Sequence, residues 1–279
     1  MKKLIYLTLS LCCLLSCNSV EKKTSLDEMN LKGKIKSIMI SRFETNMKFG
    51  EISKGDYVDY AWEMPLFSCE SPYGYSMSVI DIHFDVDGFF EFIYSYDENL
   101  DLEKKDVFVW SDANLLKKTT YGEYDIIFLE ENFFEGNKII ESIYKGEDDI
   151  IRCEYKTNDN GIIEECVAYN EKKEFQYKWK NTIRNNNIIK IEYFYKGAKD
   201  PQIISLVYKK GRLTERINVN NKETFFYNMH GDIEKYTSGD NEFVFEYEYD
   251  NKNNWVKRIT YEGIKPIYIE ERKIVYSVH

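Results

Sequence analysis

Apolar and polar residues alternate along most of this chain with a period of two. In the stretch FVFEYEYD at 243–250, aromatic residues occupy every second position, and the alternate positions hold one valine and three acidic residues. The stretches IEYFY at 191–195 and IDIHFDV at 80–86 alternate in the same way. A period of two, carried by aromatic and β-branched residues, predicts β-strands that bury one face.

Short polar stretches interrupt the alternation at regular intervals and share one pattern. Three mostly polar residues follow an apolar or aromatic residue (Thr157 in one copy), then come a fifth position and, two places later, an apolar residue. Gly and Asn dominate the fifth position and tolerate a positive φ best, so the pattern predicts turns. Neighbouring fifth positions lie 20 to 26 residues apart, which indicates an internal repeat. The eight stretches are 84–90, 110–116, 134–140, 157–163, 183–189, 207–213, 227–233 and 249–255, with fifth positions Gly88, Asn114, Lys138, Gly161, Asn187, Gly211, Gly231 and Asn253.

Each repeat of about 24 residues has room for two strands joined by tight turns. Only four prolines interrupt the chain, as a continuous hydrogen-bonded ladder requires. We therefore predict an all-β fold, an antiparallel meander of repeated hairpins that forms a long curved or spiral sheet. Charged residues in the last segment, 264–277, are expected to protect its exposed edge.

The polar run DNKNN at 250–254 has two interpretations, a cation site rich in oxygen ligands or the turn of a hairpin. Asp and Asn suit turns through side-chain-to-backbone hydrogen bonds, so we favour the turn. A hairpin folded about the middle of this run pairs Tyr249 with Trp255 and places Glu246 opposite Arg258. Trp255 is expected to be buried, because the other repeats fill its position with apolar residues: Phe90, Leu116, Ile140, Ile163, Ile189, Leu213 and Ile233.

The N-terminus has the features of a bacterial lipoprotein precursor. Lys2 and Lys3 precede an apolar run, residues 4–15, that is too short to span a bilayer as a helix but fits a signal-peptide core. The run ends in Leu14-Leu15-Ser16-Cys17, which resembles the lipobox of bacterial lipoproteins. That resemblance implies cleavage before Cys17, a diacylglycerol on its thiol, and attachment to an envelope membrane through this lipid.

Removal of residues 1–16 takes two lysines away and moves the formal charge from −10 to −12. An acidic protein is poorly suited to nucleic acid, so we expect no nucleic-acid partner. Asn18 is not the Asp that marks many lipoproteins for the inner membrane, which favours the outer membrane. We divide the chain into a signal peptide (1–16), a tether (17–30), an N-terminal β cap (31–78) and a hairpin-repeat domain (79–279).

Three cysteines remain besides Cys17, namely Cys69, Cys153 and Cys166, and this odd number rules out a complete disulfide framework. Cys153 and Cys166 flank a predicted turn. One bridge between them and two buried free thiols both remain open, and we favour the thiols.

The turn sequences show a family resemblance. Tyr249-Asp250-x-x-Asn253, Phe84-Asp85-x-x-Gly88 and Tyr227-Asn228-x-x-Gly231 resemble the YD repeats of Rhs-type proteins, although only the first two keep the Asp. With KGKIKSI at 33–39 and NNWVKRITYEG near the end, the chain is similar over residues 31–279 to YD-repeat-like envelope lipoproteins of uncharacterised function. The resemblance implies a shell built from repeats and names no activity.

The sharpest candidate for chemistry is a row of Asp81, His83, Asp85 and Asp87, whose spacing of two places them on one face of a strand. Such a row can hold a divalent cation or act as an acid/base pair. The run ends in the turn signal DVDG, so solvated carboxylates beside a turn are the simpler explanation, and we expect neither a metal site nor a cofactor. Motifs for a serine nucleophile, a zinc protease and a phosphate-binding loop are absent from the sequence, so we expect no enzymatic activity.

The chain is rich in Tyr, with 23, and Phe, with 17; most of these rings should build the core, and the exposed ones suit contact with proteins or glycans. We therefore expect a lipid-anchored envelope protein that acts as a binding or scaffold module for a protein or a glycan. The alternatives are an immunity or antitoxin-like protein for a neighbouring toxin and a hydrolase that uses the Asp81–Asp87 row.

Overall fold

The computed structural model describes residues 23–58, 78–122, 125–146 and 149–277. These ranges contain one short helix, α1 (Ser25–Glu28), and a long series of β-strands. The strands are β1 (Ile35–Lys48), β2 (Glu51–Tyr57), β3 (Val79–Phe84), β4 (Phe90–Tyr96), β5 (Leu102–Ser111), β6 (Asn114–Tyr121), β7 (Ile126–Glu135), β8 (Lys138–Lys145), β9 (Ile150–Thr157), β10 (Ile163–Asn170), β11 (Phe175–Arg184), β12 (Asn187–Tyr195), β13 (Gln202–Lys209), β14 (Arg212–Ile217), β15 (Lys222–Tyr227), β16 (Ile233–Ser238), β17 (Asn241–Tyr249), β18 (Trp255–Glu262) and β19 (Lys265–Tyr276).

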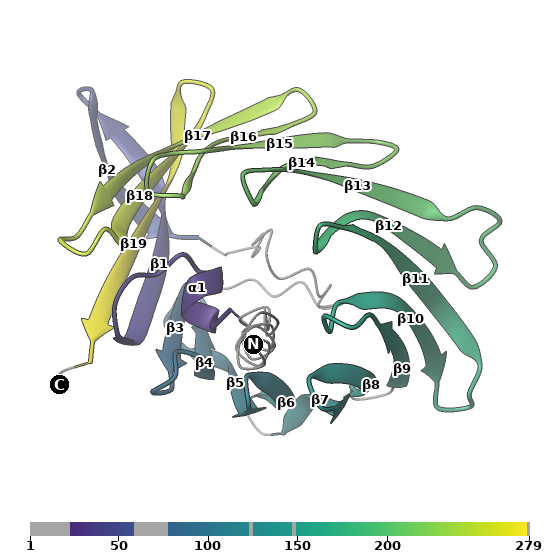
Figure 1. Ribbon diagram of the computed structural model, residues 1–279. Coiled ribbons are helices and arrows are strands. Elements are labelled where there is room, and N and C mark those ends of the chain that lie inside the picture. Colours follow the sequence, from purple (N-terminus) through teal and green to yellow (C-terminus); the bar gives the residue numbers. More distant parts are fainter. Residues whose placement is uncertain (1–22, 59–77, 123–124, 147–148, 278–279) are drawn as a thin grey trace, which may run out of the picture.

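The strands form one antiparallel sheet that closes into a barrel (Figure 1). From β3 onward each strand pairs with the next, and β1 pairs with β19 on one side and with β3 on the other. Eighteen strands form the ring, and β2 is attached to it as the second half of the β1–β2 hairpin. The all-β antiparallel meander is confirmed. The expected open curved or spiral sheet is wrong, because β1 pairs with both β19 and β3 and so closes the ring.

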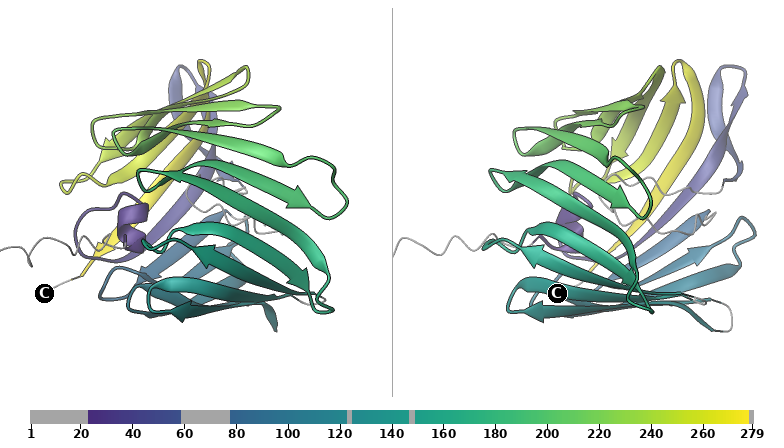
Figure 2. Two further views of the ribbon diagram at one scale, coloured as in Figure 1. Left: turned by 45° about the vertical axis from the view of Figure 1, so that its right-hand side comes forward. Right: turned by 90° about the vertical axis from the view of Figure 1, so that its right-hand side faces the viewer.

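The hairpin turns alternate between the two ends of the barrel. All eight turns predicted from the repeat lie at one end, where β1 begins and β19 ends; we call this end the repeat rim. The turns that alternate with the repeat turns along the chain form the opposite rim. They run from β1–β2 through β4–β5, β6–β7 and every second turn thereafter to β18–β19. Figure 2 shows from the side how the strands slant from one rim to the other, with α1 inside the ring.

A shared hydrogen-bond pattern builds the wide turns. At 250–254, one carboxylate oxygen of Asp250 accepts hydrogen bonds from the backbone N–H groups of Lys252 and Asn254, both at 2.9 Å. The run DNKNN is thus a turn held by an aspartate side chain, as predicted. The same pattern recurs at Asp85, Asp97, Asn158 and Asn228.

Two details of the predicted turns are wrong. Tyr96-Asp97 is a third aromatic–Asp copy, placed on the opposite rim, where the repeat analysis did not find it. Positive φ is also misplaced in three copies, since Asn114, Lys138 and Asn187 each begin a strand. There the two-residue turns characteristic of tight hairpins put positive φ earlier, at Asp112, Ala113, Gly136, Asn185 and Asn186.

A one-residue shift of register lies beside every repeat-rim turn. In the β17–β18 hairpin Tyr249 pairs with Trp255, as predicted. Beyond the shift Tyr247 faces Arg258 and Glu248 faces Lys257, so the predicted Glu246–Arg258 pair is wrong. Such bulges add one residue to one strand and move the following side chains by one position.

The helix identifies the inner face of the barrel wall. In Figure 1, α1 lies inside the ring, against the β3 and β4 side. Leu26 packs against a buried cluster that includes Met29, Ile38, Ile82 and Phe90, so Ile38 and Ile82 face the interior. Cross-strand pairing carries this assignment from strand to strand around the ring, because paired residues share a face.

Candidate functional site

Aromatic side chains from neighbouring strands gather on the inner wall. On β11 and β12, Trp179 pairs with Tyr193 and Tyr177 with Tyr195. The Tyr193 and Tyr195 rings lie nearly parallel, at an interplanar angle of 12° and a centroid distance of 6.2 Å. Tyr195 is 39% exposed, so the ring is accessible from the barrel interior. We call the following residues the aromatic strip: Tyr144, Tyr155, Tyr177, Trp179, Tyr193 and Tyr195.

The hydroxyl groups of the strip form a connected polar layer. The Tyr144 and Tyr155 hydroxyl oxygens lie 3.2 Å apart, and the Tyr177 hydroxyl lies 3.5 Å from the sulfur of Cys153. Burial, together with the neighbouring Tyr144 hydroxyl and Cys153 thiol, raises the pKa of both Tyr155 and Tyr177 well above the ordinary value. These phenols therefore stay protonated at neutral pH and can both donate and accept hydrogen bonds.

Cys153 and Cys166 lie beneath this layer as free thiols, each 1% exposed. The sequence left open either a disulfide between these cysteines or two buried free thiols, and the structure shows the free thiols. Cys153 pairs with Ala168 and Cys166 with Tyr155, so the two cysteines are diagonal neighbours. Diagonal Cα atoms are about 7–8 Å apart, beyond the usual span of a disulfide. The hydrogen bond to Cys153, together with burial, raises the pKa of Cys166 and keeps its thiol protonated.

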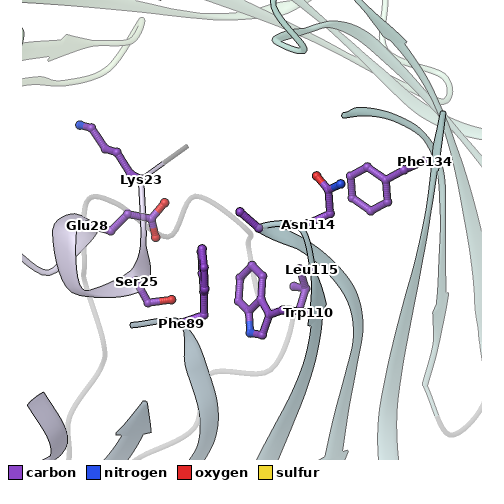
Figure 3. Close-up of a pocket in the computed structure, with 9 residues that line it drawn as sticks. Lys23, Ser25, Glu28, Phe89, Trp110, Asn114, Leu115 and Phe134 are labelled. Carbon is purple, nitrogen blue, oxygen red and sulfur yellow. The ribbon is translucent and has the colours of Figure 1, made fainter. Parts of the chain in front are cut away.

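A pocket of about 300 Å³ lies between α1 and the repeat rim (Figure 3). Phe89 and Trp110 form its floor with ring centroids 4.9 Å apart, and the Trp110 indole donates a 2.7 Å hydrogen bond to the Phe90 carbonyl. Figure 3 shows Glu28 and Lys23 on the helix side. Partial desolvation by the surrounding chain raises the pKa of Glu28, although its side chain remains accessible, and Lys23 opposes that shift.

Charged groups and rings also meet on the inner wall where β18, β19 and β1 join. Glu270 is fully buried and forms an ion pair with Arg258, and it faces Arg42 across the β1–β19 pair. The Arg272 guanidinium lies 3.4 Å above the centroid of the Trp255 ring. The charged residues of β19 therefore lie at its pairing with β1 and β18. The expectation that they protect an exposed edge is wrong.

Trp255 itself is 6% exposed, so its predicted burial is confirmed. The expected buried row is only partly present. Phe90 is buried, but Ile140 is 37% exposed and the other members are half-buried. Register is one reason: in three hairpins Leu115, Ile139 and Ile188 take the place that Trp255 has in the β17–β18 hairpin, so Leu116, Ile140 and Ile189 lie one position beyond it.

The outer wall has a different chemistry, because lysines and arginines pair there with glutamates on neighbouring strands. Most of these groups are substantially exposed, as in the Lys257–Glu248 pair at 2.8 Å. The other pairs are Lys145–Glu131, Arg152–Glu141, Lys178–Glu165, Lys222–Glu215 and Lys235–Glu242.

The predicted Asp81–Asp87 row does not assemble. Asp81 and His83 lie on the outer face of β3, 3.0 Å apart, and the His83 ring stacks on Phe92 at 4.2 Å. Asp85 lies in the following turn and accepts two backbone hydrogen bonds, while Asp87 is exposed. In the described ranges no three His, Cys, Asp or Glu side chains lie close enough together to hold a metal ion.

Cys17 and Cys69 lie outside the described residues, so the lipobox stays a prediction. Of the predicted tether (17–30), residues 23–30 are described, and Leu26 and Met29 pack against the core of the barrel. The aromatic strip was not predicted as a site. Its signal was present in the alternation of the 191–195 stretch, but the sequence does not say which face of a strand points inward. No helix in the described part of the chain is long and apolar enough to cross a membrane.

Comparison with known proteins gives weak likenesses only. No family model matches the chain, and no curated protein matches it. Among solved structures, a porin-like protein from Bacteroides uniformis ATCC 8492 is 9% identical, with a TM-score of 0.41 over 88% of this chain and 98% of that one. The TcdB2-TccC3-Cdc42 structure is 9% identical, with a TM-score of 0.35 over 83% of this chain and 14% of that one. Likeness at this level carries no functional argument.

Proposed function

We propose that this chain is a lipid-anchored envelope protein that binds a glycan against the aromatic strip inside its barrel and has no enzymatic activity. The anchor is the predicted lipid on Cys17, and the outer membrane is the predicted location. The observation that carries the proposal is the aromatic strip, a set of neighbouring rings and hydroxyl groups on the inner wall with no charged member, whereas lysines pair with glutamates on the outer face of the same strands, as in Lys178–Glu165.

The outer ion pairs support an outer surface in contact with water. A barrel whose wall faces lipid carries a band of apolar residues there, and charged residues near the bilayer midplane destabilise it. Closed barrels of about 16–18 strands leave an interior channel. A ligand could therefore enter this barrel at a rim and reach the strip.

The chemistry of the strip suits sugar rings. Tyr and Trp rings offer flat apolar faces with a polar group at the edge, which favours ligands that combine apolar faces with hydroxyl groups. Asn181 lies on the same face as Tyr177 and Trp179, and its amide nitrogen donates a 2.9 Å hydrogen bond to the Ile163 carbonyl. The strip contains no charged member, so a neutral glycan fits it better than an acidic one.

A glycan array followed by a fluorescence titration tests the proposal. The lipidated mature protein in detergent is applied to the array, and the oligosaccharide that binds best is titrated. The double variant Tyr193→Ala/Tyr195→Ala should weaken binding about tenfold or more, equivalent to at least about 1.4 kcal/mol. Phe194→Ala is the matched control, because Phe194 lies between these residues on the same strand and faces outward. It should change the affinity less than twofold.

Circular dichroism of all variants verifies that the barrel is intact. The proposal is wrong if no glycan binds the intact protein. It is also wrong if Phe194→Ala weakens binding as much as the double variant, because the inner face would then not be the binding surface.

A further inference from the structure

The chain segment before β1 is hydrogen-bonded to turns of the repeat rim on both sides of β1: to the β3–β4 turn on one side and to the β15–β16 and β17–β18 turns on the other. Near its start, the Ser25 hydroxyl accepts a 3.1 Å hydrogen bond from the Phe90 N–H, and the Leu26 N–H donates to the Gly88 carbonyl at 3.2 Å. These bonds attach it to the β3–β4 turn. We call residues 24–32 the strap.

The far part of the strap is attached to turns on the other side of β1. The Asn30 amide donates to the Asp232 carboxylate at 2.9 Å, in the β15–β16 turn. In the β17–β18 turn, the Asn254 side chain accepts from the Lys32 N–H at 2.7 Å and donates to the Lys32 carbonyl at 2.9 Å. Asn254 is 2% exposed, so water competes poorly for these bonds.

The packing of the strap adds to these bonds. Leu26, Met29 and Leu31 belong to the main buried cluster or pack against it. Leu26 also fits against Gly88, where an added Cβ would lie only 2.9 Å from a Leu26 methyl carbon. The strap is therefore an integral part of the barrel, and its start marks a fixed point on the repeat rim.

The distance to the predicted lipid is short. Cys17 precedes Lys23 by only six positions, and an extended chain covers at most about 3.3–3.6 Å per residue, so the link spans about 20–22 Å at most. The opposite rim lies further away by the height of the wall, which is about 25 Å along the barrel axis for a ten-residue strand such as β11 tilted by about 35–45°. A link this short can hold one rim at a bilayer but not the other.

We propose that the repeat rim is the membrane-docking surface of this protein and that its occupant is a phospholipid bilayer surface. The opposite mouth then faces away from the membrane and is the open entrance to the lumen. This orientation rests on the lipid anchor of the proposed function, and it adds to that function the side from which a ligand enters.

Quenching of a fluorescent residue by lipid tests the orientation. A fluorescent non-canonical amino acid is placed at Val86, in the β3–β4 turn of the repeat rim, or at Ile264, in the β18–β19 turn of the opposite rim. Both native side chains are 99% exposed, so the two positions are matched and neither substitution removes packing. The full-length protein is lipidated in cells and placed in phosphatidylethanolamine–phosphatidylglycerol vesicles that contain a headgroup-labelled spin quencher.

Quenching at Val86 should exceed quenching at Ile264 by at least about threefold, since only one rim lies within reach of the link. A variant with 20 Gly/Ser residues inserted after Asn18 should lose most of this difference, because a flexible linker frees the barrel to rotate. Val219, 86% exposed on the opposite rim, provides a second reporter and should behave like Ile264.

Flotation of the vesicles on a density gradient separates the two ways to fail. Protein that does not float with the vesicles overturns the lipid anchor and the orientation together. Protein that floats but shows equal quenching at both rims, or stronger quenching at Ile264, overturns the orientation and leaves the anchor intact.

Discussion

At the scale of single residues, one side chain at the start of each wide turn organises the rim. The oxygen of Asp250, or of Asp or Asn at the equivalent places, accepts two backbone N–H groups and leaves a residue of positive φ beside it, such as Asn253 at 63°. This chemistry is local, so the sequence predicted it correctly at 250–254. The burial of Trp255 was predictable for the same reason, because its partner Tyr249 lies just across the turn.

Truncation of Trp255 should destabilise the protein much more than truncation of the adjacent turn. Trp255 is buried beneath the Arg272 guanidinium, so Trp255→Ala should cost about 3–5 kcal/mol, the range for aromatic truncation in a core. Asn253→Ala, at an exposed position of positive φ, should cost about 1 kcal/mol. Urea denaturation of both variants measures the difference. A loss below about 0.5 kcal/mol for Trp255→Ala would be typical of an exposed ring and would contradict the observed pairing.

Asn254 should matter more to stability than its polar character suggests. Asn254→Ala leaves the backbone N–H and carbonyl of Lys32, whose bonds to the buried Asn254 side chain are partly shielded from water, without this partner, at a total cost of about 1–3 kcal/mol. Asn160→Ala is the matched control, since Asn160 also lies in a repeat-rim turn but is exposed and bonds only to another surface turn through Asn186. Its loss should stay within about 0.5 kcal/mol in the same urea experiment. Equal losses would show that the strap is not held by Asn254.

At the scale of elements, strands were predictable and their register was not. The alternation in 243–250 depends on each residue alone, so it gave β17 correctly. A bulge opposite Glu248 and Tyr249 adds one residue to the partner strand. No residue type in the sequence marks its position, so the predicted partners beyond it were displaced by one. The inner face of β12 escaped prediction for a related reason: whether Tyr193 or Phe194 points inward depends on where the whole sheet places its interior.

Two adjacent carboxylates in α1 should respond to pH in opposite ways. Partial desolvation raises the pKa of Glu28 in the folded protein, so the folded state is favoured below the ordinary Glu range and loses that advantage as pH rises through the raised pKa. Hydrogen bonds from the Thr24 backbone and hydroxyl lower the pKa of Asp27, so its stabilisation is present at neutral pH and lost as pH falls.

Stability of the variants at two pH values measures this contrast. Glu28→Gln should raise the urea midpoint at pH 8 relative to the wild type, and the gain should disappear near pH 4. Asp27→Asn should lower the midpoint at pH 8, with less effect near pH 3. If both variants shift the midpoint in the same direction at pH 8, the two carboxylates do not have the environments described.

At the scale of the whole molecule, the proposed lipid anchor would determine where the barrel is held. Cells grown with a labelled fatty acid should incorporate the label into the wild-type protein and not into the Cys17→Ser variant, because the thiol of Cys17 is the proposed acceptor. Cys69→Ser is the control and should retain the label. A wild type without label, or a Cys17→Ser variant labelled to the same extent, would remove the anchor from the proposed function.

Closure of the ring is the feature that the repeat could not reveal. The repeat predicts that each hairpin pairs with the next, and an open spiral satisfies that rule as well as a ring does. Closure depends on β1, which precedes the repeat and pairs over residues 37–41 with both β19 and β3. The sequence of β1 identifies it as a strand, but pairing between residues more than 200 positions apart leaves no local pattern.

Hydrogen exchange followed by mass spectrometry should show that closure. In a ring, the backbone amides of residues 37–41 are bonded or covered on both sides, so they should exchange as slowly as those of β10 and β11, whose strands also pair on both sides. In an open sheet, β1 or β19 would be an edge strand, and many of its outward amides would exchange with water freely. The amides of β2 serve as the internal control, because β2 pairs only with β1 within the described residues and should exchange faster. Exchange of residues 37–41 as fast as that of β2, with β10 and β11 still protected, would mean that the barrel opens at this joint in solution.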